Sequence, residues 1–269
     1  MRIMNFFLFF LLALTLNSCK SQMTDEIRPD PNFHLYLLVG QSNMAGRGKI
    51  DSLSTPNNPR VLMLTEENKW IVAKDPVHFD KPRVAGVGPG LAFAQEMMLF
   101  EKDEKVRIGL IPCAVGGTTI DMWQPGKDAY KGQYHPYDDA VRRLLIAMED
   151  GVLKGIVWHQ GEGDSNEERS KVYIDKLEKL VNLFRNESNN INTPFVAGEL
   201  GYYRDNYKLI NDQLRKLPDA IPFSAVATSE GLIHKGDGTH LDSRSARELG
   251  KRMALKMMEL QSEINQKEK

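Results

Sequence analysis

The sequence predicts an α/β fold, a three-layer α/β/α sandwich built on a mainly parallel sheet. Five short apolar runs rich in β-branched residues are typical of buried strands. Between them, apolar residues recur with the spacing of one helix face. Strands that alternate with helices form a parallel sheet covered on both faces. At 269 residues, the chain is long enough for one such domain with a substantial core.

The expected elements follow in order along the chain. The strands are LYLLV (35–39), VRIGLI (106–111), GIVW (155–158), PFVAG (194–198) and FSAVAT (223–228). The helices are indicated by apolar stripes in which residues recur three or four positions apart, namely Val141, Leu144, Leu145 and Met148; Tyr173, Leu177, Leu180, Val181 and Phe184; and Ala246, Leu249, Met253 and Met257. Such stripes indicate helix faces that pack on a core.

The N-terminus has the features of an export signal. Arg2 precedes the apolar run Phe6–Leu16, which is too short to span a bilayer and is typical of a signal-peptide core. The run leads into Leu16-Asn17-Ser18-Cys19, which resembles a bacterial lipobox. In proteins with this motif, cleavage precedes the Cys, which then carries lipid. An ordinary secretory signal with an incidental Cys is the alternative interpretation.

On the lipobox interpretation, the chain divides into three parts. Residues 1–18 are a signal peptide, and residues 19–32 are a polar, proline-bearing tether that begins at the lipidated Cys19. Residues 33–269 form the folded domain. We therefore expect a lipid-anchored protein of the bacterial cell envelope, held on the outer membrane and facing the periplasm or the cell surface.

Charge and cysteine content exclude several classes of function. Lys and Arg number 35 against 36 Asp and Glu, without clusters, so no electrostatic footprint for nucleic acid is present. With Cys19 lipidated, Cys113 is the one remaining thiol, and no intramolecular disulfide is expected. The six His residues form no H-E-x-x-H motif, and no Cys/His spacing suits zinc. We expect neither a metal nor another cofactor.

Polar or glycine-rich segments follow four of the predicted strands. They are GQSNM (40–44), PCAVGGT (112–118), HQGEGD (159–164) and DGTH (237–240). Ligands of open α/β sheets bind outside the carboxyl ends of the strands. We therefore expect these segments to meet at one edge of the sheet and to form the functional site.

The residues of these segments suit ester hydrolysis. That reaction needs a hydroxyl nucleophile, an imidazole base, a carboxylate that orients the base, and N–H donors for the oxyanion. Ser42, His240 and Asp237 supply the first three. Taken alone, a D-x-x-H segment is usually a loop or a helix cap, and a Ser after a strand is usually a turn residue. The G-x-S-x-G elbow of α/β-hydrolases does not match, because position 44 is Met.

Four blocks together make a more specific signal. They are GQSNMAGRG (40–48), IPCAVGGTTIDMW (111–123), WHQGEGDS (158–165) and DGTHLDSRSARELGKRMA (237–254). In content and order they resemble carbohydrate esterase family 6, the sialate O-acetylesterase domain, within the SGNH (GDSL-like) hydrolases. The resemblance implies a flavodoxin-like sheet.

The resemblance also implies a role for each matching residue. Ser42 is the nucleophile, His240 its base and Asp237 the carboxylate. The oxyanion donors are the backbone N–H groups of Ser42 and Gly117, with Gly116 as an alternative to Gly117. The side-chain amide of Gln160 is the third donor.

Other residues near these blocks have more than one possible role each. Glu162 and Asp164 orient His240, bind sugar hydroxyls, or only hydrogen-bond within their loop. Trp123 stacks on a sugar beside the pocket or packs in the core, and for Trp158 core packing is favoured. Arg47 contacts substrate or caps its loop.

The expected function is a serine esterase that removes O-acetyl groups from carbohydrates through an acyl-enzyme. Its partner is an acetylated oligo- or polysaccharide, either acetylated xylan or a related glycan, with O-acetylated sialic acid as an alternative. A lipid or thioester hydrolase would need an apolar groove, and the loops 47–60 and 123–137 are polar. A carbohydrate-binding lipoprotein without activity would have no need of the complete catalytic set.

Overall fold

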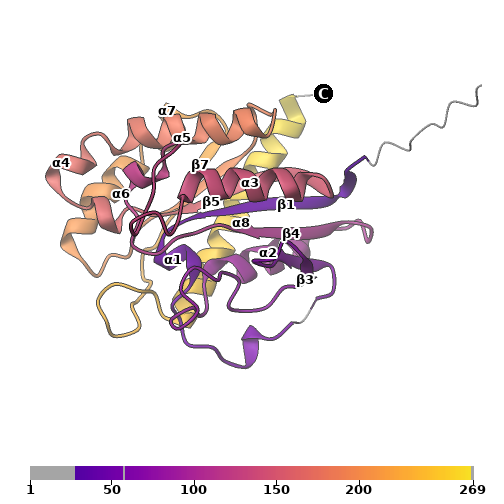
Figure 1. Ribbon diagram of the computed structural model, residues 1–269, viewed down its shortest axis with the longest axis horizontal. Helices are drawn as coiled ribbons and strands as arrows, with labels where there is room; N and C mark the ends of the chain where they lie inside the picture. The colour runs from indigo at the N-terminus through magenta and orange to yellow at the C-terminus, as the bar shows by residue number, and fades with distance from the viewer. Residues whose placement is uncertain (1–27, 57, 268–269) are drawn as a thin grey trace, which may run out of the picture.

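A computed structural model of the protein describes residues 28–56 and 58–267 (Figure 1). The predicted signal peptide, Cys19 and most of the predicted tether lie outside these residues. The strands are β1 (Asp30–Gly40), β2 (Val61–Leu64), β3 (Trp70–Val72), β4 (Arg107–Pro112), β5 (Gly151–His159), β6 (Phe195–Gly198) and β7 (Ser224–Ala227). All five predicted strands are present, and β2 and β3 are additional.

The strands form one sheet in the order β3-β2-β4-β1-β5-β6-β7. Every neighbouring pair is parallel except the β2–β3 hairpin, where Leu62 lies opposite Val72. The five predicted strands, numbered along the chain, stand in the order 2-1-3-4-5, which is the flavodoxin-like order. The predicted mainly parallel, flavodoxin-like sheet is therefore confirmed.

Helices cover both faces of this sheet. They are α1 (Ser42–Ala45), α2 (Pro89–Phe100), α3 (Pro136–Met148), α4 (Glu167–Ser170), α5 (Tyr173–Glu187), α6 (Lys208–Leu214), α7 (Leu217–Ala220) and α8 (Ser243–Lys267), with 3₁₀ turns η1 (Ser52–Ser54), η2 (Ile120–Trp123), η3 (Glu162–Asp164) and η4 (Asp205–Tyr207). One core joins α3, α5, α6 and α7 to one face, and a second core joins α2 and α8 to the other (Figure 1). These are the predicted three layers.

Strand β1 runs through the centre of the sheet and contributes to both cores. Leu35 and Leu37 belong to the core beneath α3 and α5, whereas Tyr36 and Leu38 belong to the core beneath α2 and α8. This alternation is the period of two of an extended strand whose two faces are both covered. A continuous apolar run, and not an alternating one, is therefore its sequence signature.

The first strand begins earlier than the sequence predicts. Asp30 already belongs to β1, pairs with Gly151, and donates its N–H to the carbonyl of Asp150 at 3.0 Å. The last residues assigned to the predicted tether, 30–32, are polar but belong to this strand.

The carboxyl ends of β1 and β5 lie side by side in the middle of the sheet. Gly40, the last residue of β1, has φ 131°, and a Cβ there would lie 2.1 Å from the carbonyl oxygen of His159. Glycine is required for this close approach. The N–H of Gln41 then donates to the same carbonyl at 2.9 Å. The contact turns the chain sharply out of the sheet, so that Ser42 begins α1 at the switch point of the strand order.

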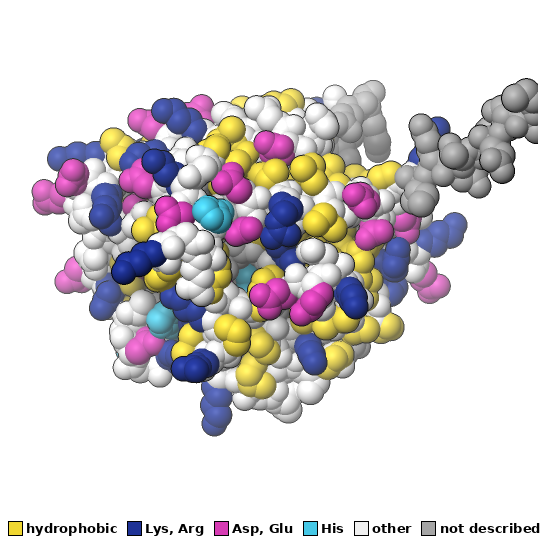
Figure 2. Space-filling view, in the orientation of Figure 1, with side chains coloured by type: hydrophobic (Ala, Val, Ile, Leu, Met, Phe, Trp, Pro, Cys, Tyr) yellow, Lys and Arg dark blue, Asp and Glu magenta, His cyan; other side chains and the backbone are white. Residues whose placement is uncertain are grey.

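Charged side chains of both signs are spread over the face seen in Figure 2, with apolar patches between them. No helix of the described residues is long and apolar enough to cross a membrane.

Candidate active site

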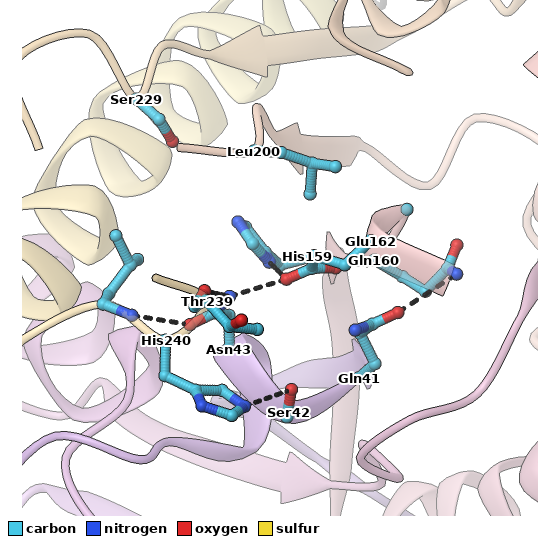
Figure 3. A network of polar contacts seen from close by, with 12 residues as sticks. Gln41, Ser42, Asn43, His159, Gln160, Glu162, Leu200, Ser229, Thr239 and His240 are labelled. Carbon is cyan, nitrogen blue, oxygen red and sulfur yellow. Dashed lines mark hydrogen bonds and ion pairs between the residues drawn. The ribbon is translucent and has the colours of Figure 1, made fainter. Parts of the chain in front are cut away.

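Ser42 is the first residue of α1, directly after β1, and is nearly buried with 7% exposure. Its Oγ lies 3.0 Å from Nε2 of His240, although the two residues are 198 positions apart (Figure 3). A serine hydroxyl at this distance from an imidazole nitrogen has the geometry of a nucleophile beside its base.

The second nitrogen of the same imidazole is held by Asp237. Nδ1 of His240 and Oδ2 of Asp237 are 2.8 Å apart. The other carboxylate oxygen accepts the backbone N–H groups of Thr239 at 2.9 Å and of His240 at 2.8 Å. A single carboxylate therefore folds its own loop and orients the ring. Its contact with Nδ1 favours the tautomer in which Nε2 accepts a proton.

The environment keeps the Asp237 carboxylate ionised. Partial burial opposes ionisation, but hydrogen bonds from the His240 N–H, the His240 ring and the Thr239 N–H outweigh it and lower the pKa of Asp237. A carboxylate that accepts several hydrogen bonds remains charged well below neutral pH. Asp237 is thus suited to stabilise an imidazolium.

The two other candidate carboxylates form different contacts. Oε1 of Glu162 accepts the side-chain N–H of Asn43 at 2.6 Å and lies 3.9 Å from Nδ1 of His159. Oδ2 of Asp164 accepts the N–H of Ile120 at 2.9 Å. Among the carboxylates of residues 28–56 and 58–267, only that of Asp237 hydrogen-bonds to the His240 ring.

Hydrogen bonds distinguish the two glycines after β4, Gly116 and Gly117, as candidate oxyanion donors. The N–H of Gly116 donates to Oδ2 of Asp80 at 2.8 Å, so it is already occupied. The N–H of Gly117 has no acceptor among the described residues, and Gly117 has φ 82°. The Ser42 N–H, in the first turn of α1, likewise has no acceptor in the described part of the chain. Ser42 and Gly117 therefore have N–H groups free for an oxyanion.

The contacts of Gln160 do not fit the expected oxyanion donor. Its side chain is completely buried, and Nε2 donates to the carbonyl of Thr118 at 3.0 Å and to Oδ2 of Asp164 at 2.6 Å. Its Oε1 accepts the hydroxyl of Tyr173 at 3.1 Å, which fixes the orientation of the amide. Both N–H groups of the Gln160 amide therefore already have acceptors within the protein. Gln160 therefore braces the loops below the site, and the expectation of a third donor from it is corrected.

Trp123 also differs from its predicted position. It is completely buried, packs edge-to-face on Trp158 at a ring distance of 5.3 Å, and donates its indole N–H to Oγ1 of Thr118 at 3.0 Å. A buried ring cannot stack on a sugar, so the predicted substrate contact is wrong. The apolar packing of Trp158 against it explains why both indoles belong to the core.

Arg47 caps its own loop. One terminal nitrogen donates to the carbonyl of Gly46 at 2.7 Å, and the other pairs with Oδ2 of Asp80 at 2.7 Å. Asp80 thereby holds Arg47 and the Gly116 N–H with one oxygen. Asp80 lies in the loop between β3 and α2, outside every recognised motif, so no sequence pattern predicted its role.

A hollow of about 500 Å³ opens over Ser42 and His240. Its wall carries the cationic side chains of Lys81, Arg204 and Lys235. The remaining lining residues are Gln41, Arg47, Val84, Gly116, Gly117, Glu162, Gly163, Tyr207, Asp237 and Thr239. The Ser42 hydroxyl thus lines an open depression in which most of the lining residues are polar or charged.

The sequence is similar to known carbohydrate esterases. The family model described as carbohydrate esterase, sialic acid-specific acetylesterase matches residues 32–259. A probable carbohydrate esterase of Arabidopsis thaliana is 30% identical over 250 residues, covering 84% of this chain and 90% of that protein.

Solved structures show the same fold. An X-ray structure of an Arabidopsis thaliana protein matches with a TM-score of 0.77 and 27% identity, covering 86% of this chain and 99% of that one. The structure of NanS matches with a TM-score of 0.69 at 17% identity, covering 87% of this chain and 99% of that one. A carbohydrate acetylesterase from Xanthomonas citri matches with a TM-score of 0.64 at 20% identity, covering 85% of this chain and 56% of that one.

Proposed function

The chain belongs to the family of carbohydrate esterases described as sialic acid-specific acetylesterases, and we propose that it removes O-acetyl groups from glycans through an acyl-enzyme on Ser42. The observation that carries this proposal is the line of contacts from Asp237 through His240 to Ser42, at 2.8 and 3.0 Å. These contacts lie at the base of a hollow that is open to solvent.

In the first half of the reaction, Oγ of Ser42 attacks the acetyl carbonyl carbon and Nε2 of His240 takes the hydroxyl proton. The tetrahedral intermediate collapses as the bond between the carbonyl carbon and the sugar oxygen breaks. His240 returns its proton to that oxygen, and the deacetylated sugar leaves. Ser42 now carries the acetyl group as an ester.

In the second half, His240 takes a proton from water, and the water oxygen attacks the acetyl carbonyl. The bond to Oγ breaks, and the proton on His240 returns to Ser42. The products are acetate and free enzyme. Asp237 stays ionised throughout and stabilises the imidazolium in both halves.

The backbone N–H groups of Ser42 and Gly117 stabilise the oxyanion. In known esterases and proteases, each such donor contributes roughly 3 kcal/mol to the transition state. The loops contribute by holding these groups rigidly, since the Gly116 N–H is fixed on Asp80 and the Gln160 amide is fixed on Thr118.

Two substrate classes fit the hollow, acetylated xylan or related neutral glycans, and O-acetylated sialic acid. Lys81, Arg204 and Lys235 in its wall favour a substrate that bears a carboxylate. Acetate release from a panel that contains both classes tests the proposal. Release from neither class would leave a carbohydrate-binding protein without catalysis.

We also propose that the protein is lipidated on Cys19 and held in the bacterial cell envelope. The support is the lipobox-like Leu16-Asn17-Ser18-Cys19 after a short apolar run. Strand β1 begins at Asp30, so on this proposal the chain between Cys19 and Asp30 would join the lipid to the domain.

A further inference from the structure

We propose that Asn43 is a positioning residue that clamps the loop of His240 onto the helix of Ser42, so that one amide sets the distance between nucleophile and base. This inference rests on the proposed serine esterase function. It assigns a role to Asn43, the residue that follows the nucleophile. Asn43 itself makes no contact with the reacting atoms.

The side chain of Asn43 holds the main chain on both sides of His240. Its Nδ2 donates to the carbonyl of Thr239 at 3.1 Å, and its Oδ1 accepts the N–H of Leu241 at 2.9 Å. Figure 3 shows Asn43 between the loop of His240 and the segment of Glu162. The amide thereby joins α1 to a loop almost 200 residues further along the chain.

Glu162 fixes which way this amide points. Oε1 of Glu162 accepts the second N–H of Nδ2 at 2.6 Å. An ionised carboxylate only accepts hydrogen bonds, so it selects the rotamer in which Nδ2 faces Glu162 and Oδ1 faces Leu241. The amide then makes three hydrogen bonds to three separate segments, and Asn43 is buried with 4% exposure.

No shorter or charged side chain replaces this set of contacts. Serine has one hydroxyl and cannot reach both main-chain groups. Aspartate accepts from Leu241 but places a negative charge against Glu162 and the Thr239 carbonyl. A buried amide that supplies a donor and an acceptor at once is therefore specific to this position.

The clamp acts on the orientation of His240 and leaves the binding of substrate alone. The hollow is lined by Ser42, Thr239 and Glu162, whereas Asn43 lies behind them. The turn that joins Asp237 to His240 has its own hydrogen bonds, so imidazole and carboxylate move together if the clamp is lost. Only the distance between His240 and Ser42 is then free to increase.

The first test compares Asn43→Ala with Asn211→Ala. Asn211 is the matched control, because it is also a buried amide that binds one N–H and one carbonyl, both of Leu200. We expect Asn43→Ala to lower kcat on 4-nitrophenyl acetate by about tenfold to a hundredfold with little change in KM, since small displacements of a catalytic group have effects of this size. Asn211→Ala should lose thermal stability but keep kcat.

The second test places a carboxylate opposite Glu162 and follows kcat as a function of pH. In Asn43→Asp, two carboxylates face each other, so one of them binds a proton more readily than an isolated carboxylate does. The protonated pair again supplies a donor. The ratio of variant to wild-type kcat should therefore rise as the pH falls from 9 to 5. Adding Glu162→Gln provides a neutral donor, and the ratio should then be flat.

A fluorophosphonate probe separates this inference from the proposed substrate. In that reaction Oγ of Ser42 bonds to phosphorus, the P–F bond breaks, fluoride leaves and His240 takes the serine proton. Wild-type protein should be labelled even if no acetylated glycan is hydrolysed, and Asn43→Ala should be labelled at least tenfold more slowly. If Asn43→Ala matches Asn211→Ala in kcat and labelling rate, or if the pH ratio of Asn43→Asp is flat, Asn43 only stabilises the fold and the inference is overturned.

Discussion

The backbone N–H of Gly116 donates to Oδ2 of Asp80 at 2.8 Å, and this bond leaves the N–H of Gly117 as the free donor of the glycine pair. The same oxygen pairs with the buried guanidinium of Arg47 at 2.7 Å. Gly116 is thus tied to the loop that carries Asp80, and the Gly117 N–H is left without an acceptor among the described residues. A carboxylate outside every recognised block therefore shapes the oxyanion site.

We expect Gly117→Ala to lower kcat by at least a hundredfold. Gly117 has φ 82°, which strains any residue with a Cβ, and a Cβ there would also clash with the hydroxyl of Tyr130, so we expect the backbone that carries the N–H to shift. Loss of one oxyanion donor costs about a hundredfold to a thousandfold. Gly132 is the matched control, because it has the same φ of 82° but open space around its Cβ position.

Gly132→Ala should thus lose only the stability that any residue loses at positive φ. Steady-state kinetics and thermal melts of both variants check the prediction. Equal kcat values for the two variants would show that the Gly117 N–H does not face the oxyanion.

Ser42→Ala should abolish acetyl-ester hydrolysis and leave the fold and its thermal midpoint nearly unchanged. Removing a covalent nucleophile lowers kcat by several orders of magnitude. The control is Ser188→Ala, since Ser188 has the same 7% exposure but its hydroxyl bonds only the neighbouring residues Arg185 and Thr193. Residual turnover above about a tenth of wild type, measured as acetate release, would exclude Ser42 as the nucleophile.

Four strands inside the sheet and the edge strand β7 were predictable, because buried strands have short continuous apolar runs. Strands β2 and β3 were missed, since they have only four and three residues and β3, at the opposite edge of the sheet, is largely exposed. Helix α2 was missed for the opposite reason. It is packed between β4 and α8, and apolar residues occupy most of its surface, so no one-sided stripe results.

Those residues of the site that belong to the four recognised sequence blocks were predictable. Ser42, Asp237 and His240 were placed together by the strand ends, and their distances fit that expectation. The direction of a side chain was not predictable. Gln160 points into the protein because Thr118 and Asp164 offer better acceptors there than open solvent does. Such choices depend on contacts between segments distant in sequence.

Cys19 should carry lipid when the full chain is expressed in a bacterium. A labelled fatty acid should be incorporated into the wild-type protein, and Cys19→Ala should prevent it. Cys113→Ala is the natural control, because Cys113 is the second of the two cysteines and should not affect incorporation. Label that persists in Cys19→Ala would refute the lipobox interpretation.

Asp75 should destabilise the protein at high pH. It is buried with 6% exposure, and burial raises its pKa to about 7, against the opposing charge of Arg247 at 4.0 Å. Between pH 4 and 7 the unfolded chain ionises this carboxyl and the folded chain does not, so stability falls as pH rises through this window.

Replacing Asp75 by Asn removes this ionisation. At pH 8, Asp75→Asn should be more stable than wild type by a few kcal/mol, since each pKa unit corresponds to about 1.4 kcal/mol. At about pH 2.5 this carboxyl is protonated in both the folded and the unfolded chain, and the difference should vanish. Thermal melts at both values check this, and a pH-independent difference would mean that Asp75 is charged in the folded protein.

The last prediction separates Asp237 from Glu162 as the partner of His240. Asp237 contacts Nδ1 of His240 at 2.8 Å, whereas Glu162 contacts Asn43 and lies 3.9 Å from a different imidazole, that of His159. Asp237→Asn should therefore lower kcat by up to about four orders of magnitude, because the amide favours the wrong tautomer and cannot stabilise the imidazolium. Glu162→Gln keeps an acceptor for Asn43 and should cost less than tenfold.

The pH profile distinguishes a catalytic carboxylate from a structural one. Because the pKa of Asp237 is held below its ordinary value, its own titration lies below the pH range of catalysis. The acidic limb of kcat/KM then reports protonation of the imidazole. In Asp237→Asn this limb should move to lower pH, since the imidazolium loses its negative neighbour. In Glu162→Gln it should stay in place. If Glu162→Gln moves the limb and abolishes turnover while Asp237→Asn does neither, the base is oriented by Glu162, and Asp237 serves only to fold its loop.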